Sequence, residues 1–319
     1  MSVSGHYRIC RVPVFAGAPW SLVRSLALAL CLVGCSSGIN ITDNDGGISR
    51  REDETVTQIT PRGDPAFSLL AQTADLLTYE RRGDRPNVGV IGTDGRNDWL
   101  IRPEGGAHAL SWSANSARIL ISTPEPPYRL YTTRPDDTGH VEIATSERPI
   151  DAAWSADESR IAYTVAVTPD ASPQLVLADA TGQNVRQLTH DPRSKSLPSW
   201  SADDAMISFV GFDVSGGGFY SVSILVLDDP GLEVVDLARE ASLFEDFVPF
   251  TRPTWASFAP IVAFSVLKSS TLARIDFVDT RDGVRRQVTD GSFGDILLDW
   301  SPGRGFVSFA RHIEMSWFS

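Results

Sequence analysis

Short runs of apolar residues alternate with polar turns along the chain at a regular interval. Tryptophans mark this interval with spacings of 42, 46, 55 and 45 residues, at Trp112, Trp154, Trp200, Trp255 and Trp300. The residue seven positions after each tryptophan is aliphatic, and the residue nine positions after it is large and apolar. Apolar residues two positions apart are typical of a strand rather than a helix. The pattern predicts a repeated unit of β-strands with the tryptophans in its core.

The unit that contains Trp154 indicates how many strands each repeat holds. Polar turns separate four apolar runs, at residues 151–154, 160–165, 174–178 and 185–189. The turn at residues 179–182 reads Asp-Ala-Thr-Gly, in which Asp caps the turn and Gly supplies a positive φ. Four antiparallel strands in about 42 residues match the dimension of a propeller blade.

The number of blades follows from a sixth, degenerate copy. Leu70 stands 42 residues before Trp112, with apolar residues at both expected spacings after it. The last unit has only three apolar runs, near residues 296–300, 306–310 and 313–318. Residues 56–60 (Val-Thr-Gln-Ile-Thr) are similar to the fourth strands of other units. We therefore predict an all-β, six-bladed β-propeller over residues 55–319, in which this N-terminal strand completes the last blade and covers its edge.

The first 34 residues have the layout of a lipoprotein signal peptide. Arg8, Arg11 and Arg24 carry all the formal charge before position 35, and an apolar run follows Arg24. That run is too short to span a bilayer as a helix. It ends Leu-Val-Gly-Cys at Cys35, which resembles the bacterial lipobox. We predict a lipid anchor at Cys35 and a flexible tether over residues 35–54; the alternative is an ordinary signal peptide with an incidental cysteine.

Composition fits an exported protein. The 319 residues include 40 acidic and 28 basic residues, a net charge of -12, which disfavours nucleic acid as a partner. Cleavage before Cys35 leaves one of the three cysteines, so no disulfide is expected. The serine after Cys35 is typical of lipoproteins sorted to the outer membrane. We therefore expect a location in the cell envelope, at the outer membrane and facing the periplasm.

The repeated motifs carry a family resemblance. Trp-Ser-Ala-Asp at Trp154 and Trp200, Trp-Ser-Pro at Trp300, and Gln-Leu-Thr at residues 187–189 resemble the repeat of TolB-type six-bladed propellers. The resemblance covers residues 56–319, although every copy departs from the usual Trp-Ser-Pro-Asp-Gly. It does not carry over the place of TolB in a trans-envelope complex, because a tether replaces the extra domain of that protein. The same repeat occurs with serine peptidases and in pectate-degrading lyases, so the resemblance implies fold rather than function.

No motif identifies catalytic or metal-binding residues. Four histidines lie outside the signal, namely His108, His140, His190 and His312, and none stands at metal-ligand spacing. No Gly-x-Ser-x-Gly motif occurs. A site shared by His108 and His190 near the axis stays open, as does chemistry by unassigned carboxylates. We predict no catalytic residues, no metal and no cofactor.

Loop length indicates where a partner would bind. Connections from the second to the third strand, and from the fourth strand to the next unit, emerge on one face of a propeller, and the long ones cluster there. The widest, residues 239–252, holds three phenylalanines that either plug the channel or anchor a partner. Basic groups before the inner strands would hold a carboxylate-bearing peptide or glycan. The predicted partner-binding residues are Phe244, Phe247, Phe250, Arg252, His190, Arg148, Arg62 and His108.

These observations together predict a monomeric envelope lipoprotein whose propeller binds an envelope protein or peptide and is not an enzyme. The alternative is a carbohydrate- or peptide-active enzyme, a lyase or hydrolase, with its site at the loop-rich channel mouth. Carboxylates or histidines that converge at the mouth would favour the enzyme. A broad rim of mixed aromatic and basic residues would favour binding.

Overall fold

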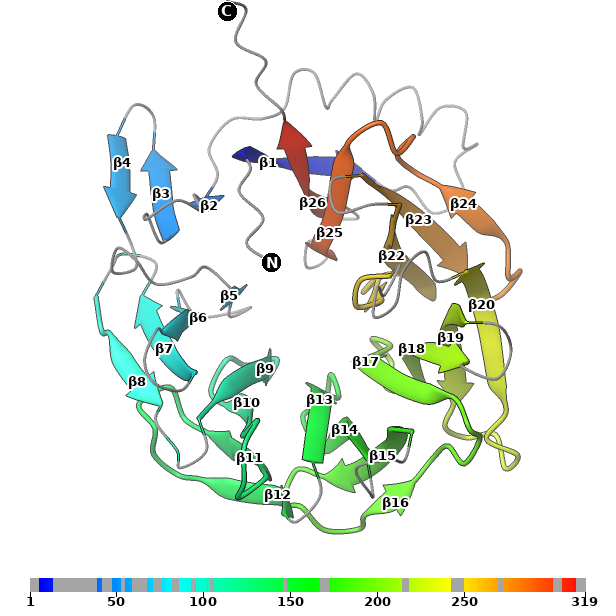
Figure 1. Ribbon diagram of the computed structural model, residues 1–319, viewed down its shortest axis with the longest axis horizontal. Helices are drawn as coiled ribbons and strands as arrows, with labels where there is room; N and C mark the ends of the chain where they lie inside the picture. Colours follow the sequence, from blue (N-terminus) through cyan, green and yellow to red (C-terminus); the bar gives the residue numbers. More distant parts are fainter. Residues whose placement is uncertain are drawn as a thin grey trace, which may run out of the picture.

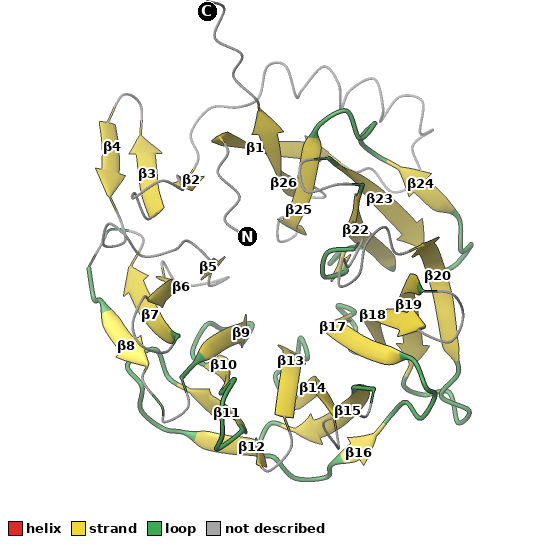
Figure 2. Ribbon diagram, in the orientation of Figure 1, coloured by secondary structure: helices red, strands yellow, loops and turns green. Residues whose placement is uncertain are grey.

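The computed structural model arranges antiparallel β-sheets in a ring around a central axis (Figure 1). It describes strands at residues 6–13, 39–41, 48–52, 55–58 and 68–70, and residues 76–313 with gaps at 82–85, 93, 95, 102, 104–105, 146–147, 167–171, 214–217, 242–249, 269–271 and 301–305. These residues form strands and turns without a helix, which confirms the all-β prediction (Figure 2). The described part of the chain thus offers no helix of the length and hydropathy that crossing a membrane requires.

Five modules of the ring consist of four antiparallel strands each. In every module the strands follow chain order from an inner strand near the axis to an outer strand at the rim (Figure 1). The modules are β5–β8 (Ser68–Leu70, Leu76–Arg81, Asn87–Gly92, Trp99–Ile101), β9–β12 (His108–Trp112, Ile119–Ser122, Arg129–Thr133, Val141–Thr145), β13–β16 (Arg148–Trp154, Arg160–Ala166, Gln174–Asp179, Arg186–Gln187), β17–β20 (Ser194–Trp200, Met206–Asp213, Phe219–Val226, Val234–Ala241) and β21–β24 (Thr254–Trp255, Ile261–Leu267, Ala273–Asp279, Arg285–Gln287). The predicted four-stranded repeat is confirmed.

A fixed register relates each inner strand to the next strand. Each repeat tryptophan pairs with the residue seven positions later. Leu70 pairs with Leu77 in the same way, which confirms the degenerate copy. The five tryptophans are 6% to 9% exposed, and the residues seven and nine positions after each are buried. The predicted core position of the tryptophans is therefore confirmed.

The tryptophans also link neighbouring modules through their indole nitrogens. Such bonds run from Trp200 Nε1 to Ala153 O (3.1 Å), from Trp255 Nε1 to Ser199 O (3.2 Å) and from Trp300 Nε1 to Thr254 O (3.2 Å). Each acceptor directly precedes the tryptophan of the preceding module. Because a buried N–H without a partner costs free energy, these bonds favour one packing register between modules. Trp154 Nε1 is buried without a hydrogen-bond partner among the described residues.

The turn after an inner strand is closed by its serine and the acidic or amide residue two positions later. Ser155 Oγ donates to Asp157 Oδ1 at 2.7 Å and accepts from the backbone N–H of Arg160 at 2.9 Å. The same arrangement recurs at Ser113 and Ser201. The hydroxyl of Ser155 and the N–H and hydroxyl of Ser159 lower the pKa of Asp157 to about 2. The polar residues that follow the tryptophan in the repeated motif thus close the turn by hydrogen bonds.

The last module differs from the prediction in its closing strand. It contains β25 (Gly294–Trp300), β26 (Phe306–Ile313) and β1 (His6–Pro13), which pairs antiparallel with β26. The predicted closing role of residues 56–60 is wrong, because β4 (Thr55–Gln58) pairs with β3 (Ile48–Glu52), which also pairs with β2 (Ile39–Ile41). Only two residues separate β3 from β4, so this hairpin closes with little loss of chain entropy. An N-terminal strand does pair with the last module, but that strand is β1, and it is the third of the strands described there.

The predicted count of six blades is not confirmed. Among the described residues the strands form the five four-stranded modules, the last module with β1, and the separate sheet β2–β4, which occupies a sector of its own between β1 and β5 (Figure 1). β1 lies within the predicted signal peptide, and β2 and β3 lie within the predicted tether. The assignments of residues 1–34 and 35–54 stay predictions. If the signal is cleaved as predicted, β26 loses its β1 partner.

Candidate binding face

The loop-rich face is the end of the ring at which the inner strands begin. His108 is the first residue of β9, and Arg148 is the first residue of β13. His190 precedes β17 by four residues. All three side chains are exposed, and none has a hydrogen-bond or ion-pair partner among the described residues. Three of the predicted partner-binding residues therefore stand on this face at consecutive modules.

The guanidinium of Arg252 makes structural contacts with two neighbouring modules. Its Nη1 donates to Ala152 O at 3.2 Å and to Pro198 O at 3.0 Å, and its Nη2 lies 3.5 Å from Asp151 Oδ1. Burial lowers the pKa of Arg252, and the Asp151 carboxylate opposes that shift. The guanidinium thus connects the segment before β21 with β17 and β13. This arrangement braces three modules along their inner strands and leaves fewer donors for a ligand than the sequence indicates.

A second polar cluster fixes the connection between β16 and β17. Lys195 has a fully buried side chain, and its Nζ donates to Asp191 Oδ1 at 2.8 Å and to Arg193 O at 2.6 Å. Arg193 also pairs with Asp236 of β20 at 3.1 Å. Burial lowers the pKa of Lys195 despite the opposing carboxylate of Asp191. Sequence reasoning does not single out Lys195, although it is one of only two lysines in the chain.

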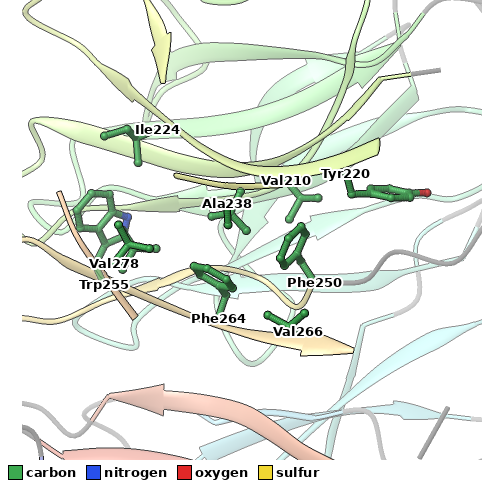
Figure 3. Packing of buried hydrophobic residues seen from close by; sticks show 11 residues of the cluster. Val210, Tyr220, Ile224, Ala238, Phe250, Trp255, Phe264, Val266 and Val278 are labelled. Atoms are coloured by element: carbon green, nitrogen blue, oxygen red, sulfur yellow. The ribbon is translucent and has the colours of Figure 1, made fainter. Parts of the chain in front are cut away.

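Phe250 lies in the core instead of on the rim. It is 2% exposed, forms a β-bridge with Val266, and packs edge-on against Phe264 with ring centroids 5.4 Å apart (Figure 3). It belongs to an apolar cluster that also holds Val210 and Tyr220 of the preceding module. The structure therefore corrects the prediction for Phe250, because a side chain buried here cannot anchor a partner.

Three further predicted partner-binding residues belong to segments that the structure does not describe. Phe244, Phe247 and Arg62 lie outside the described residues. Their predicted roles stay predictions.

Ion pairs hold the end of β20, directly before residues 242–249. Glu240 of β20 lies 2.8 Å from Arg285 Nη2, 3.4 Å from Arg274 Nη2 and 3.7 Å from Lys268 Nζ. The buried carboxylate of Asp276 pairs with the same two arginines. Burial raises the pKa of Glu240, but the hydrogen bond from Arg285 and the nearby cations outweigh it and lower the pKa overall. Both sides of residues 242–249 are thus fixed, by this cluster and by Phe250.

Apolar side chains also reach the loop-rich face. Ile150, Leu272 and Phe293 are 39%, 42% and 43% exposed. Ile150 stands two residues after the exposed arginine of β13. Leu272 and Phe293 are neighbours, because the residues that follow them, Ala273 and Gly294, pair in parallel. The described part of the face therefore mixes basic and apolar groups with acidic ones such as Glu125 and Asp290.

The opposite face carries acidic turns whose carboxylates cap their own backbone. Asp179 Oδ1 accepts hydrogen bonds from the N–H of Thr181 at 2.9 Å and of Gln183 at 2.8 Å. These groups lower the pKa of Asp179, led by the hydroxyl of Thr181. In the described ranges no three His, Cys, Asp or Glu side chains stand close enough together to hold a metal ion.

No protein-family model and no curated protein sequence matches this chain. Solved structures do match it. An oligogalacturonate lyase in complex with manganese has a TM-score of 0.58 at 13% identity, over 88% of this chain and 86% of the lyase. TolB from Acinetobacter baumannii has a TM-score of 0.55 at 13% identity, over 95% of this chain and 66% of TolB.

A puromycin-hydrolyzing peptidase from Mycobacterium tuberculosis has a TM-score of 0.58 at 14% identity. That match covers 79% of this chain but only 42% of the peptidase. Likeness at such low identity shows the fold alone. The ring of repeated modules is therefore a TolB-like β-propeller fold.

Proposed function

We propose that this protein is a membrane-anchored envelope scaffold whose loop-rich face binds another protein or a peptide. The observation that carries the proposal is the row of exposed basic side chains, His108, Arg148 and His190, at the beginnings of consecutive inner strands. Charge-assisted hydrogen bonds from such groups suit a carboxylate-bearing segment. The exposed apolar residues of the same face supply contact area beside them.

Two acidic residues near that row, Asp151 and Asp191, support the same conclusion because their charge is already compensated. Asp151 accepts the backbone N–H of Leu197 at 3.1 Å and faces Arg252. Asp191 is paired with Lys195 and Arg193. Arg148 therefore adds positive charge beside these compensated carboxylates, and His108 and His190 add hydrogen-bonding groups, on a chain whose net charge is -12. An acidic partner is attracted to this face in preference to the acidic turns opposite.

Photocrosslinking in the native host tests the binding proposal. A photoreactive residue at Arg148 or Phe247 should give a discrete crosslinked species, and the same residue at Asp229, in an exposed turn of the opposite face, should not. A purified partner segment should then lose affinity in the His108→Ala and Arg148→Ala variants. Crosslinks of equal yield from both faces, or none from the loop-rich face in a folded protein, would count against the proposal.

The proposed anchor has a separate test. Metabolic labelling with a fatty acid should mark the wild-type protein, and Cys35→Ala should abolish the label and release the chain into the soluble fraction. Fractionation of the two membranes then tests the outer-membrane location. A labelled Cys35→Ala protein would contradict the assignment of the lipidated residue.

A second candidate is an enzyme that acts on a carbohydrate or a peptide at the channel mouth. Two of the solved structures with a similar fold are enzymes by name, an oligogalacturonate lyase and a puromycin-hydrolyzing peptidase, and this favours the second candidate. The purified chain should then turn over oligogalacturonate or peptide substrates, and His108→Ala or His190→Ala should abolish turnover. Binding without turnover, lost on the same substitutions, would leave the scaffold as the function.

A further inference from the structure

The outer strand β20 differs from the other outer strands of the ring. It has eight residues, whereas β8, β12, β16 and β24 have three, five, two and three. β20 is the last strand of its sheet, and it pairs only with β19 among the described strands. Its second residue, Val235, is 44% exposed. A long exposed edge of this kind is a template for pairing with another strand.

Asp236 and Arg239, two of the three charged residues of β20, do not guard this edge, and the third, Glu240, pairs with residues of the next module. Asp236 accepts hydrogen bonds from Arg193 at 3.1 Å and from Ser223 Oγ at 2.6 Å. The guanidinium of Arg239 lies 4.4 Å from the ring centroid of Phe219 on β19. Both side chains therefore lie along the face of their own sheet. Lysine and proline, which commonly protect sheet edges, are absent from β20.

A bulge places these two charges on one face of the sheet. Ser223 pairs with Asp236, but Val222 pairs with Ala238, so Leu237 is the extra residue. Arg239 then pairs with Ser221, which lies on the same face as Ser223, and the two serine hydroxyls are 2.9 Å apart. Asp236 and Arg239 thus project to the same side although three positions separate them.

We propose that β20 pairs antiparallel with β20 of a second copy of this chain, around a twofold axis between Leu237 and Ala238. This register sets Asp236 opposite Arg239 of the second copy and, by symmetry, Arg239 opposite Asp236 of the second copy. A shift of one residue sets Asp236 opposite Glu240 or leaves both charges opposite uncharged residues. The charge pattern of the strand therefore selects one self-complementary register.

The size of the contact sets the strength of the dimer. Two paired edge strands bury less than the roughly 1,200–2,000 Å² of a standard stable interface. The association is consequently weak and depends on protein concentration. This dimer replaces the monomer expected from sequence and leaves the loop-rich face of both copies open.

Sedimentation velocity of the purified full chain, up to about 1 mM, tests the proposal. The wild type should convert from monomer to dimer as concentration rises. Arg239→Asp and Asp236→Arg should each weaken self-association about tenfold or more, because each variant sets like charges opposite one another twice. An equimolar mixture of the two variants should restore a dimer, since each copy then supplies the charge that the other lacks.

If Asp236→Arg fails to fold, a comparison of two substitutions at Arg239 still tests the proposal. Arg239→Lys should dimerise as the wild type does, while Arg239→Asp does not. Val185→Asp, at an exposed valine of another module, should leave dimerisation unchanged. A wild type that is monomeric at every concentration, or an Arg239→Asp variant as dimeric as the wild type, would overturn the proposal.

Discussion

Arg252 and Asp151 stand at the same position of two modules, three residues before Trp255 and Trp154, and their side chains approach to 3.5 Å across the module between them. Leu197 takes this position in the intervening module, and its N–H donates to Asp151 Oδ2 at 3.1 Å. One repeat position, occupied by three different residue types, thus links three neighbouring modules. The repeat fixes where this position lies in each module, and the different residues that occupy it make the contacts between modules.

Arg252→Ala should destabilise the protein by about 3 kcal/mol, because it leaves the Ala152 and Pro198 carbonyls and the Asp151 carboxylate without their donor. Urea unfolding followed by tryptophan fluorescence measures the change. Arg148→Ala, at an exposed arginine of the same face, should alter the free energy of unfolding by less than about 0.5 kcal/mol. Equal effects of the two variants would contradict the bracing role of Arg252.

Phe250→Ala should cost about 3–5 kcal/mol of stability, because it opens a cavity in the core between β18–β20 and β22. Phe293→Ala, at an exposed ring, should cost less than about 1 kcal/mol. Thermal unfolding of both variants distinguishes them. If Phe250→Ala kept full stability and lost only partner binding, Phe250 would be an anchor after all.

Trp300→Phe should cost about 1 kcal/mol more than Trp154→Phe. Both changes remove similar volume, but only Trp300 loses a hydrogen bond, from Nε1 to Thr254 O. The buried Nε1 of Trp154 has no partner among the described residues to lose. Denaturant unfolding of the two variants gives the difference, and equal losses would show that the bonds between modules add nothing to stability.

Asp157 should titrate near pH 2 instead of at its ordinary value of 3.8. Its pKa is lower in the folded state, so the stabilisation that it provides is complete above about pH 5 and is lost progressively as the pH falls through about 2. Carbon-detected NMR of the carboxyl group measures the midpoint. Ser155→Ala should raise that midpoint towards 3.8, while Ser201→Ala should raise the midpoint of Asp203 instead.

Removal of residues 1–34 should lower stability, because it exposes the edge of β26 that β1 covers over eight paired residues. Urea unfolding of chains beginning at Met1 and at Cys35, both with Cys35→Ser, gives the comparison. Identical unfolding curves would show that the last module does not depend on β1 and would suit a cleaved signal peptide.

The repeat could be predicted from sequence because its contacts are local. Trp200 pairs with Ile207 seven positions later, and the turn between them is closed by Ser201 and Asp203. Such contacts leave a periodic trace in the order of apolar and polar residues. The strand content, the core tryptophans and the degenerate copy at Leu70 were therefore within reach of the sequence alone.

Contacts between distant parts of the chain were determined only by the tertiary structure. The sequence pattern predicted that the segment of β4 covers β26, but β4 pairs with the nearby β3 and β1 covers β26. The sequence predicted both Phe250 and Arg252 as exposed loop residues. Phe250 instead packs in the core, and Arg252 donates to the carbonyl of Ala152, 100 residues earlier in the chain. Apolar periodicity records which face of a strand is buried. It does not indicate which residues a loop side chain contacts, because burial in a loop depends on packing between modules.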